Sequence, residues 1–278
     1  MRPLLLILLI LTFAIVVVNA SYARDLELKL LFDKDTYLIG EPIWIDILVI
    51  NHGDSTLSLL IPEPLFCGIS FTVVNNGKDT LRYIGDHAES LGSDNYESEP
   101  GDTLYALYNL LDGYPLSNSP SPLIQKPLQG DVEINARYWG VSTSETKRIS
   151  IISPEGDEKA AYSLLAARGE GFLHRAPVKN LEAIVQNYPR SVYAALAADL
   201  LSGAYGITYN DSTRHKYYAM LILEEYPNSG YVKSGVGKYI GRHDDPNRGA
   251  RIDSLLMPGN SFRVRMLARN KKLGRLDF

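Results

Sequence analysis

Few residues in this chain are spaced for catalysis. The five histidines stand apart from one another, without the paired spacing that metal ligands show (His52, His87, His174, His215 and His243). The single cysteine, Cys67, lies in the apolar context LFCGI, which favours a buried small hydrophobe over a nucleophile. There is no G-x-S-x-G, phosphate loop or dinucleotide-binding motif. We therefore predict a protein that is not an enzyme and that needs no cofactor and no catalytic metal.

The acidic segment from residue 86 to residue 102 is a candidate metal-binding site. It holds six carboxylates and no Lys or Arg (Asp86, Glu89, Asp94, Glu97, Glu99 and Asp102). Carboxylate oxygens are ligands that Ca²⁺ prefers, but their spacing here fits no calcium-loop motif. A solvated loop is the favoured interpretation, and calcium binding stays an open alternative.

The C-terminal segment from residue 242 to residue 278 is basic, with nine Lys and Arg against four Asp, in a chain whose net charge is -4. Residues 262–267 form a weakly amphipathic stretch. The segment is either disordered, folded back on an acidic neighbour, or in weak contact with an anionic envelope surface. Its candidate partner-binding residues are Arg263, Arg265 and Arg269. The mild acidity of the whole chain argues against a nucleic-acid partner.

The first 23 residues indicate export. Arg2 precedes an apolar run over residues 4–18, and small residues then permit cleavage after Ala20 or Ala23. The run is shorter than the roughly 20 residues of a membrane-spanning helix. We predict a signal peptide and a periplasmic or extracellular protein, and the choice between these two locations stays open.

Residues 24–153 have the pattern of a β domain. Short runs of β-forming residues alternate with turn residues such as Asn75-Asn76-Gly77, and no helical period is present. This pattern predicts two antiparallel sheets packed face to face. The expected strands cover residues 26–32, 43–50, 56–60, 69–74, 80–83, 103–110, 131–138 and 147–152.

Three turn motifs carry a family resemblance. Gly40-Glu41-Pro42 precedes the second expected strand, Pro100-Gly101 precedes a middle one, and Gln129-Gly130 precedes a late strand that ends at Tyr138. Together they resemble bacterial immunoglobulin-like domains, a fold family that includes intracellular proteinase inhibitors of bacilli. Gln129 replaces the usual proline. The resemblance covers about residues 26–153 and implies an immunoglobulin-like sandwich.

After Pro154 and Gly156 the composition changes and the apolar period becomes helical. Helices are expected over residues 157–173, 177–187, 191–201, 212–225 and 229–241, with Ser191 and Asp211 as N-caps. The adjacent residues Tyr217 and Tyr218 diverge by about 100° on a helix. One of them is therefore exposed, which makes the pair a further candidate for partner contact.

Two similar hexapeptides occur in the helical half of the chain. They are YPRSVY from Tyr188 and YPNSGY from Tyr226, at an offset of 38 residues (226 minus 188). Ile184 and Ile222 match at the same offset. The Pro ends one helix, the Ser begins the next, and the second Tyr fills the seam. This arrangement resembles degenerate tetratricopeptide repeats over about residues 157–241, which implies a concave surface for a partner's peptide or helix. With about two and a half units, the helices are expected to lean on the sandwich or on each other's ends for burial.

The predicted fold class is therefore multidomain β + α. It comprises a signal peptide (1–23), an N-terminal immunoglobulin-like antiparallel β-sandwich (24–153), C-terminal tetratricopeptide-like helical hairpins (154–241) and a basic tail (242–278). The predicted function is an exported, non-catalytic protein–protein interaction or scaffold protein of the bacterial cell envelope. The alternatives are a protease inhibitor acting through sandwich loops and a carbohydrate-binding or hydrolase accessory protein. The partner and the oligomeric state stay open.

Overall fold

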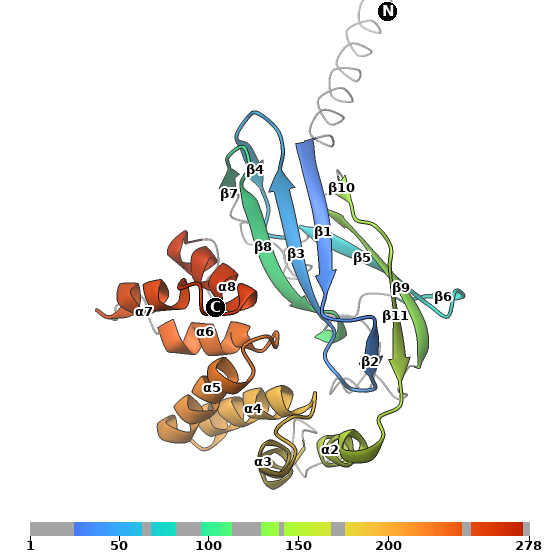
Figure 1. The fold of residues 1–278 in the computed structure, drawn as a ribbon, viewed down its shortest axis with the longest axis vertical. Coiled ribbons are helices and arrows are strands. Elements are labelled where there is room, and N and C mark those ends of the chain that lie inside the picture. Colours follow the sequence, from blue (N-terminus) through green and yellow to red (C-terminus); the bar gives the residue numbers. More distant parts are fainter. Residues whose placement is uncertain are drawn as a thin grey trace, which may run out of the picture.

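The computed structural model of the chain describes residues 25–62, 68–81, 96–112, 129–138, 142–167, 176–240 and 246–274. The predicted signal peptide, Cys67, most of the acidic segment, and three of the histidines (His87, His174 and His243) lie outside these residues. The described part has a β region (residues 26–152) followed by a helical region (residues 156–272), which lie beside each other (Figure 1). The chain is thus a mixed β and α protein.

The β region contains eleven strands among the described residues: β1 (Leu26–Phe32), β2 (Thr36–Leu38), β3 (Trp44–Asn51), β4 (Leu57–Leu59), β5 (Ile69–Asn75), β6 (Asp79–Leu81), β7 (Tyr96–Ser98), β8 (Thr103–Asn109), β9 (Gly130–Tyr138), β10 (Ser142–Thr143) and β11 (Lys147–Ile152). One sheet has the order β1-β3-β8, and a second has the order β2-β11-β9-β5-β6 with β10 paired to β9. Strands β4 and β7 form a separate pair. The one parallel ladder in this part joins β2 to β11.

The eight expected strands are present, with bounds that shift by one or two residues. Strands β2, β7 and β10, each of two or three residues, were not predicted. Side chains from both larger sheets meet in one apolar core, for example Ile47 from β3 and Ile134 from β9, both fully buried. The two sheets therefore pack face to face.

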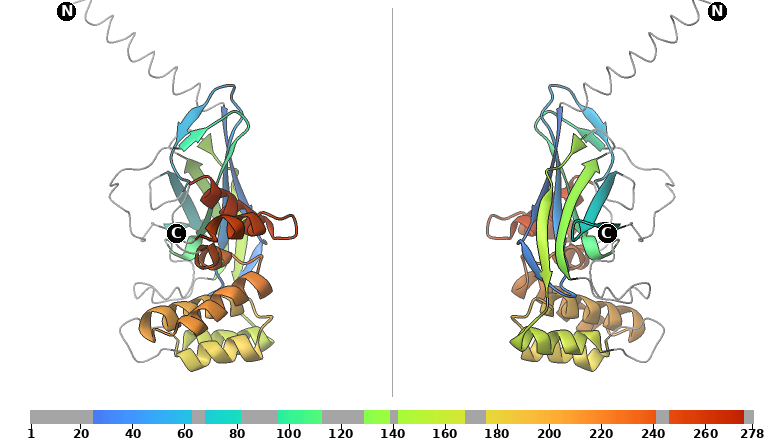
Figure 2. Two further views of the ribbon diagram at one scale, coloured as in Figure 1. Left: turned by 90° about the vertical axis from the view of Figure 1, so that its left-hand side faces the viewer. Right: turned by 90° about the vertical axis from the view of Figure 1, so that its right-hand side faces the viewer.

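Strands β3 and β8 of the three-stranded sheet are covered on both faces, so they form the middle layer of the molecule. In β8, Leu104 and Ala106 belong to the core between the sheets, whereas Tyr105 and Leu107 belong to a second core that they share with the helices. The C-terminal helices lie across this outer face (Figure 2). Of the two expected sources of burial for the helices, packing against the β region is confirmed.

The helical region contains seven α-helices among the described residues: α2 (Gly156–Ala166), α3 (Val178–Asn187), α4 (Ala194–Gly203), α5 (Ser212–Glu225), α6 (Val232–Ile240), α7 (Arg248–Leu255) and α8 (Phe262–Lys272). A π-helical turn, η3 (Ala204–Thr208), extends α4, and a short 3₁₀ turn, η2 (Leu110–Asp112), follows β8. The predicted cap is present on α5, where Asp211 accepts from the N–H groups of Thr213 and Arg214. The helix predicted from Ser191 begins three residues later, after a turn.

The described part of the basic C-terminal segment is folded. Its helices α7 and α8 contribute Ile252, Leu255, Val264 and Leu267 to the second core. Of the alternatives for this segment, disorder is therefore wrong for residues 246–274. The ion pairs of Arg263 show that the segment instead folds back on an acidic neighbour.

A cleft between the β region and two helix joints

The two hexapeptides form matching joints between helices. In the first joint (residues 188–193), the N–H of Tyr188 bonds to the carbonyl of Ile184, and the hydroxyl of Ser191 accepts from the N–H of Tyr193 at 3.2 Å. In the second joint (residues 226–231), Tyr226, Ser229 and Tyr231 make the same bonds, with the same 3.2 Å distance. The repeat in the sequence is thus a repeat in geometry.

Both joints pack against the connection that leads from β2 into β3. In the first, Tyr193 is fully buried and its hydroxyl donates to the carbonyl of Ile39 at 2.7 Å. In the second, the ring of Tyr231 meets Trp44 edge-on, with centroids 5.0 Å apart. The tyrosines that were expected to fill seams between helices therefore reach the β region as well.

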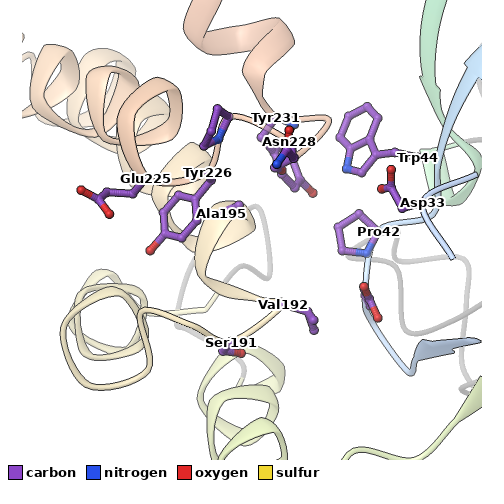
Figure 3. Close-up of a pocket in the computed structure, with 13 residues that line it drawn as sticks. Asp33, Pro42, Trp44, Ser191, Val192, Ala195, Glu225, Tyr226, Asn228 and Tyr231 are labelled. Atoms are coloured by element: carbon purple, nitrogen blue, oxygen red, sulfur yellow. The ribbon is translucent and has the colours of Figure 1, made fainter. Parts of the chain in front are cut away.

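A cleft of about 230 Å³ lies between this connection and the joints. Pro42 and Trp44 form one wall, and Val192 and Ala195 face them from the first joint and α4 (Figure 3). The lining residues are Asp33, Glu41, Pro42, Trp44, Ser191, Val192, Ala195, Glu225, Tyr226, Pro227, Asn228, Ser229 and Tyr231. We call this hollow the joint cleft.

The joint cleft is acidic. Asp33, Glu41 and Glu225 line it, and none of its described lining residues is Lys, Arg or His. Burial raises the pKa of the Glu41 carboxyl, against the opposing effect of Lys34, whose ammonium group lies 2.6 Å away. Burial likewise raises the pKa of Asp33, opposed by Arg263. Both carboxylates are engaged by cations from outside the lining, and these cations only partly offset the cost of burying the carboxylates.

Trp44 adds a polar group to this wall. Its indole nitrogen is buried and has no hydrogen-bond partner among the described residues. A buried donor without an acceptor costs on the order of 1–3 kcal/mol. The nitrogen lies on the edge of the ring that is turned toward the hollow (Figure 3). The wall therefore combines an unsatisfied donor with carboxylate acceptors.

Arg263, one of the predicted contact residues, points inward from α8. It is 4% exposed, and its guanidinium pairs with Asp46 and Asp33 across the boundary between the two regions. It also donates to the carbonyl of Asn228 in the second joint. The prediction that Arg263 contacts an outside partner is wrong, because this side chain is buried and all of these contacts lie within the protein.

The structure does not bring the other candidates to the joint cleft. Arg265 is partly buried on α8, and Arg269 is half-exposed, with a guanidinium nitrogen 3.6 Å from Asp102. On α5, Tyr217 is exposed and Tyr218 is buried, as the divergence of adjacent helical residues predicted. These residues stay candidates for surface contact, apart from the buried Tyr218.

The residues that build the cleft were missed in the sequence because each looks ordinary alone. Asp46 alternates with Ile45 and Ile47, which is typical of a solvent-facing position, yet it is 6% exposed because helices cover that face. Trp44 begins the same strand. The usable signal was the near-continuous apolar character of residues 43–50 and 103–108, which is typical of a sheet covered on both sides.

Two further features bear on chemistry. Within the described ranges, no three His, Cys, Asp or Glu side chains are placed to hold a metal ion. Of the helices in the same ranges, none has the length and apolar character needed to span a bilayer. Of the acidic segment 86–102, where calcium was an open alternative, residues 86–95 lie outside these ranges.

No protein-family model and no curated protein matches the chain. Among solved structures, the CARDB domain of a Pyrococcus furiosus protein, in complex with di-metal ions, is 13% identical. The match covers 47% of this chain and 94% of that domain, with a TM-score of 0.26.

A β-glucosidase from Listeria innocua, in complex with gluconolactone, is 10% identical over 45% of this chain and 16% of its own length, with a TM-score of 0.28. An alkylpurine DNA glycosylase from Pseudomonas fluorescens is 7% identical over 49% of this chain and 35% of its own, also with a TM-score of 0.28. This chain thus spans a small part of either enzyme. Similarities this weak carry no inference about function.

Proposed function

We propose that this chain is an exported, non-catalytic scaffold protein of the bacterial cell envelope, which holds a segment of a partner protein in the joint cleft. In this proposal the β region is an immunoglobulin-like sandwich and the helical region is a short tetratricopeptide-like stack. The apolar run and small residues at positions 4–23 support export. The matching joints support the helical repeat.

The joint cleft is the observation that carries the proposal. It is built from three separate parts of the chain, namely the connection into β3 and the two joints, and it combines aromatic walls with carboxylates. Aromatic side chains are enriched where proteins bind one another. Two of its three carboxylates, Asp33 and Glu41, are held in ion pairs, and its described lining residues include no His or Cys for a nucleophile–base pair. These features favour binding over catalysis.

A capture experiment with a blocked cleft tests the proposal. The full-length chain would be expressed in its native envelope, cross-linked and recovered through a C-terminal tag. Val192→Lys places a long cation in the cleft, and the matched control Thr72→Lys adds the same charge on the exposed face of β5.

We expect a specific partner with the wild-type chain and with Thr72→Lys, and its loss with Val192→Lys. Equal capture by both variants would show that the joint cleft is not the binding site. Failure of the wild-type chain to capture any specific partner would overturn the scaffold proposal itself.

A further inference from the structure

We propose that the joint cleft recognises a cationic side chain, lysine or arginine, presented by an extended segment of the partner protein. This inference rests on the proposed function and names the chemistry of its site. The first supporting observation is the balance of charge around the cleft. Three carboxylates line the cleft, and the two cations that pair with them, Lys34 and Arg263, stand outside the lining.

The third carboxylate, Glu225, comes from the end of α5 and is exposed at the rim of the cleft. Asp33 is also accessible, because 45% of its side chain is exposed although it pairs with Arg263. Arg263 is shared between Asp33 and the buried Asp46, so these two carboxylates together with Glu41 and Glu225 outnumber Lys34 and Arg263 by two. The carboxylate of Glu225 points away from Trp44 and Pro42 (Figure 3), so it adds negative charge at the outer rim of the cleft.

The walls suit the rest of such a side chain. Trp44, Tyr226 and Tyr231 line the cleft, and aromatic rings attract guanidinium and ammonium groups. Pro42 and Val192 are apolar and can pack against its methylene stem. The same chain already uses this chemistry twice internally, with Lys34 over the ring of Tyr37 and Arg214 over the ring of Tyr205.

The size of the cleft selects a side chain over a larger ligand. Pockets for drug-sized molecules have volumes of roughly 300–1,000 Å³, whereas the joint cleft has about 230 Å³. The cleft thus has room for one side chain beside its carboxylate acceptors.

Trp44 also reports on occupancy. The chain has two tryptophans, so Trp139→Phe leaves Trp44 as the sole indole fluorophore. Four capped pentapeptides, acetyl-Gly-Gly-X-Gly-Gly-amide with X as Arg, Lys, norleucine or Glu, would be titrated into this full-length variant. Broadening of the peptides' NMR signals by the protein gives a second readout that does not depend on fluorescence.

We expect saturable binding of the Arg and Lys peptides, weaker at high salt, and none of the norleucine and Glu peptides. Glu225→Gln should weaken binding about two- to fivefold, the effect of one exposed charge pair. The matched control Glu224→Gln, an exposed neighbour outside the lining, should leave binding unchanged.

Equal binding of norleucine, or no binding of Arg and Lys by either readout, would overturn the inference. The proposed function has its own test, the capture experiment, and it fails if capture from the envelope does not depend on the cleft. A partner that is lost with Val192→Lys while all four peptides stay unbound would therefore refute the cationic ligand and retain the scaffold.

Discussion

Arg263 on α8 forms an ion pair with Asp46 on β3, with 2.9 Å between Nη2 and Oδ2, although 217 residues separate them. The hydroxyl of Tyr105 donates to the same carboxylate at 2.6 Å, and Asp33 accepts from the same guanidinium. Because Arg263 also holds the carbonyl of Asn228, the C-terminal helix fixes the second joint against the β region. The geometry of the cleft thus depends on the basic segment.

Arg263→Met should therefore destabilise the whole protein. It leaves Asp46 buried without its cation, and breaking a buried pair in this way costs about 3–5 kcal/mol. The matched control is Arg269→Met on the same helix, whose pair with Asp102 is partly exposed and should contribute less than about 1 kcal/mol. Urea unfolding followed by circular dichroism measures both. Equal losses for the two variants would contradict a special role for Arg263.

Gly230 is predicted to be intolerant of a side chain. A Cβ atom built there overlaps the indole ring of Trp44, so Gly230→Ala must push the second joint away from the β region. Overpacking of this kind costs about 1–3 kcal/mol. Gly203 in α4 has no heavy atom within 4 Å of its Cβ position. Gly203→Ala should stabilise the protein by up to about 1 kcal/mol, since alanine favours helices. Thermal unfolding would show shifts of opposite sign.

Much of the fold could be predicted from local pattern. Alternation in Val132-Glu133-Ile134 and turn residues such as Asn76 located the strands, because each signal lies within a few residues. The repeat located the joints for the same reason. Domain boundaries and the family resemblances stay predictions, since each rests on motifs that different folds share.

The joint cleft could not be predicted, because it depends on contacts between distant segments. A period of two in Ile45-Asp46-Ile47 says that Asp46 faces away from Ile47, and it says nothing about what covers that face. Basic residues such as Arg263 are usually exposed in folded proteins. Only the packing of α8 on the sheet makes the two residues partners and buries both.

The adjacent residues Tyr217 and Tyr218 differ in burial, because one lies at the surface and the other in the core. Tyr218 is buried and stacks on Tyr205 with centroids 5.8 Å apart, whereas Tyr217 is 58% exposed. Tyr218→Ala should cost about 3 kcal/mol, as for other buried aromatics. Tyr217→Ala should change stability by less than about 0.5 kcal/mol. If Tyr217→Ala nonetheless abolished capture of the envelope partner, the binding surface would extend beyond the joint cleft to α5.

Glu41 should make stability depend on pH in a defined direction. Burial raises the pKa of its carboxyl in the folded state, so the native protein binds this proton more tightly than the unfolded chain does. Its contribution to stability is fully present below the unfolded pKa of about 4.3 and is lost as pH rises through the higher folded value. Glu41→Gln cannot ionise, and Lys34, which is 38% exposed, stays solvated when its partner is removed.

The stability of the variant should therefore increase relative to that of the wild-type chain as pH rises above the unfolded pKa of about 4.3, because Glu41 must then lose its proton in a buried position. Urea midpoints for the two proteins, taken at intervals of pH above that value, measure this increase as a difference that grows with pH. A difference that instead grew on acidification would mean that Lys34 and the N–H of Leu38 outweigh burial at Glu41. The carboxylate would then be a stabilising part of the cleft wall, and its replacement would loosen the connection between β2 and β3.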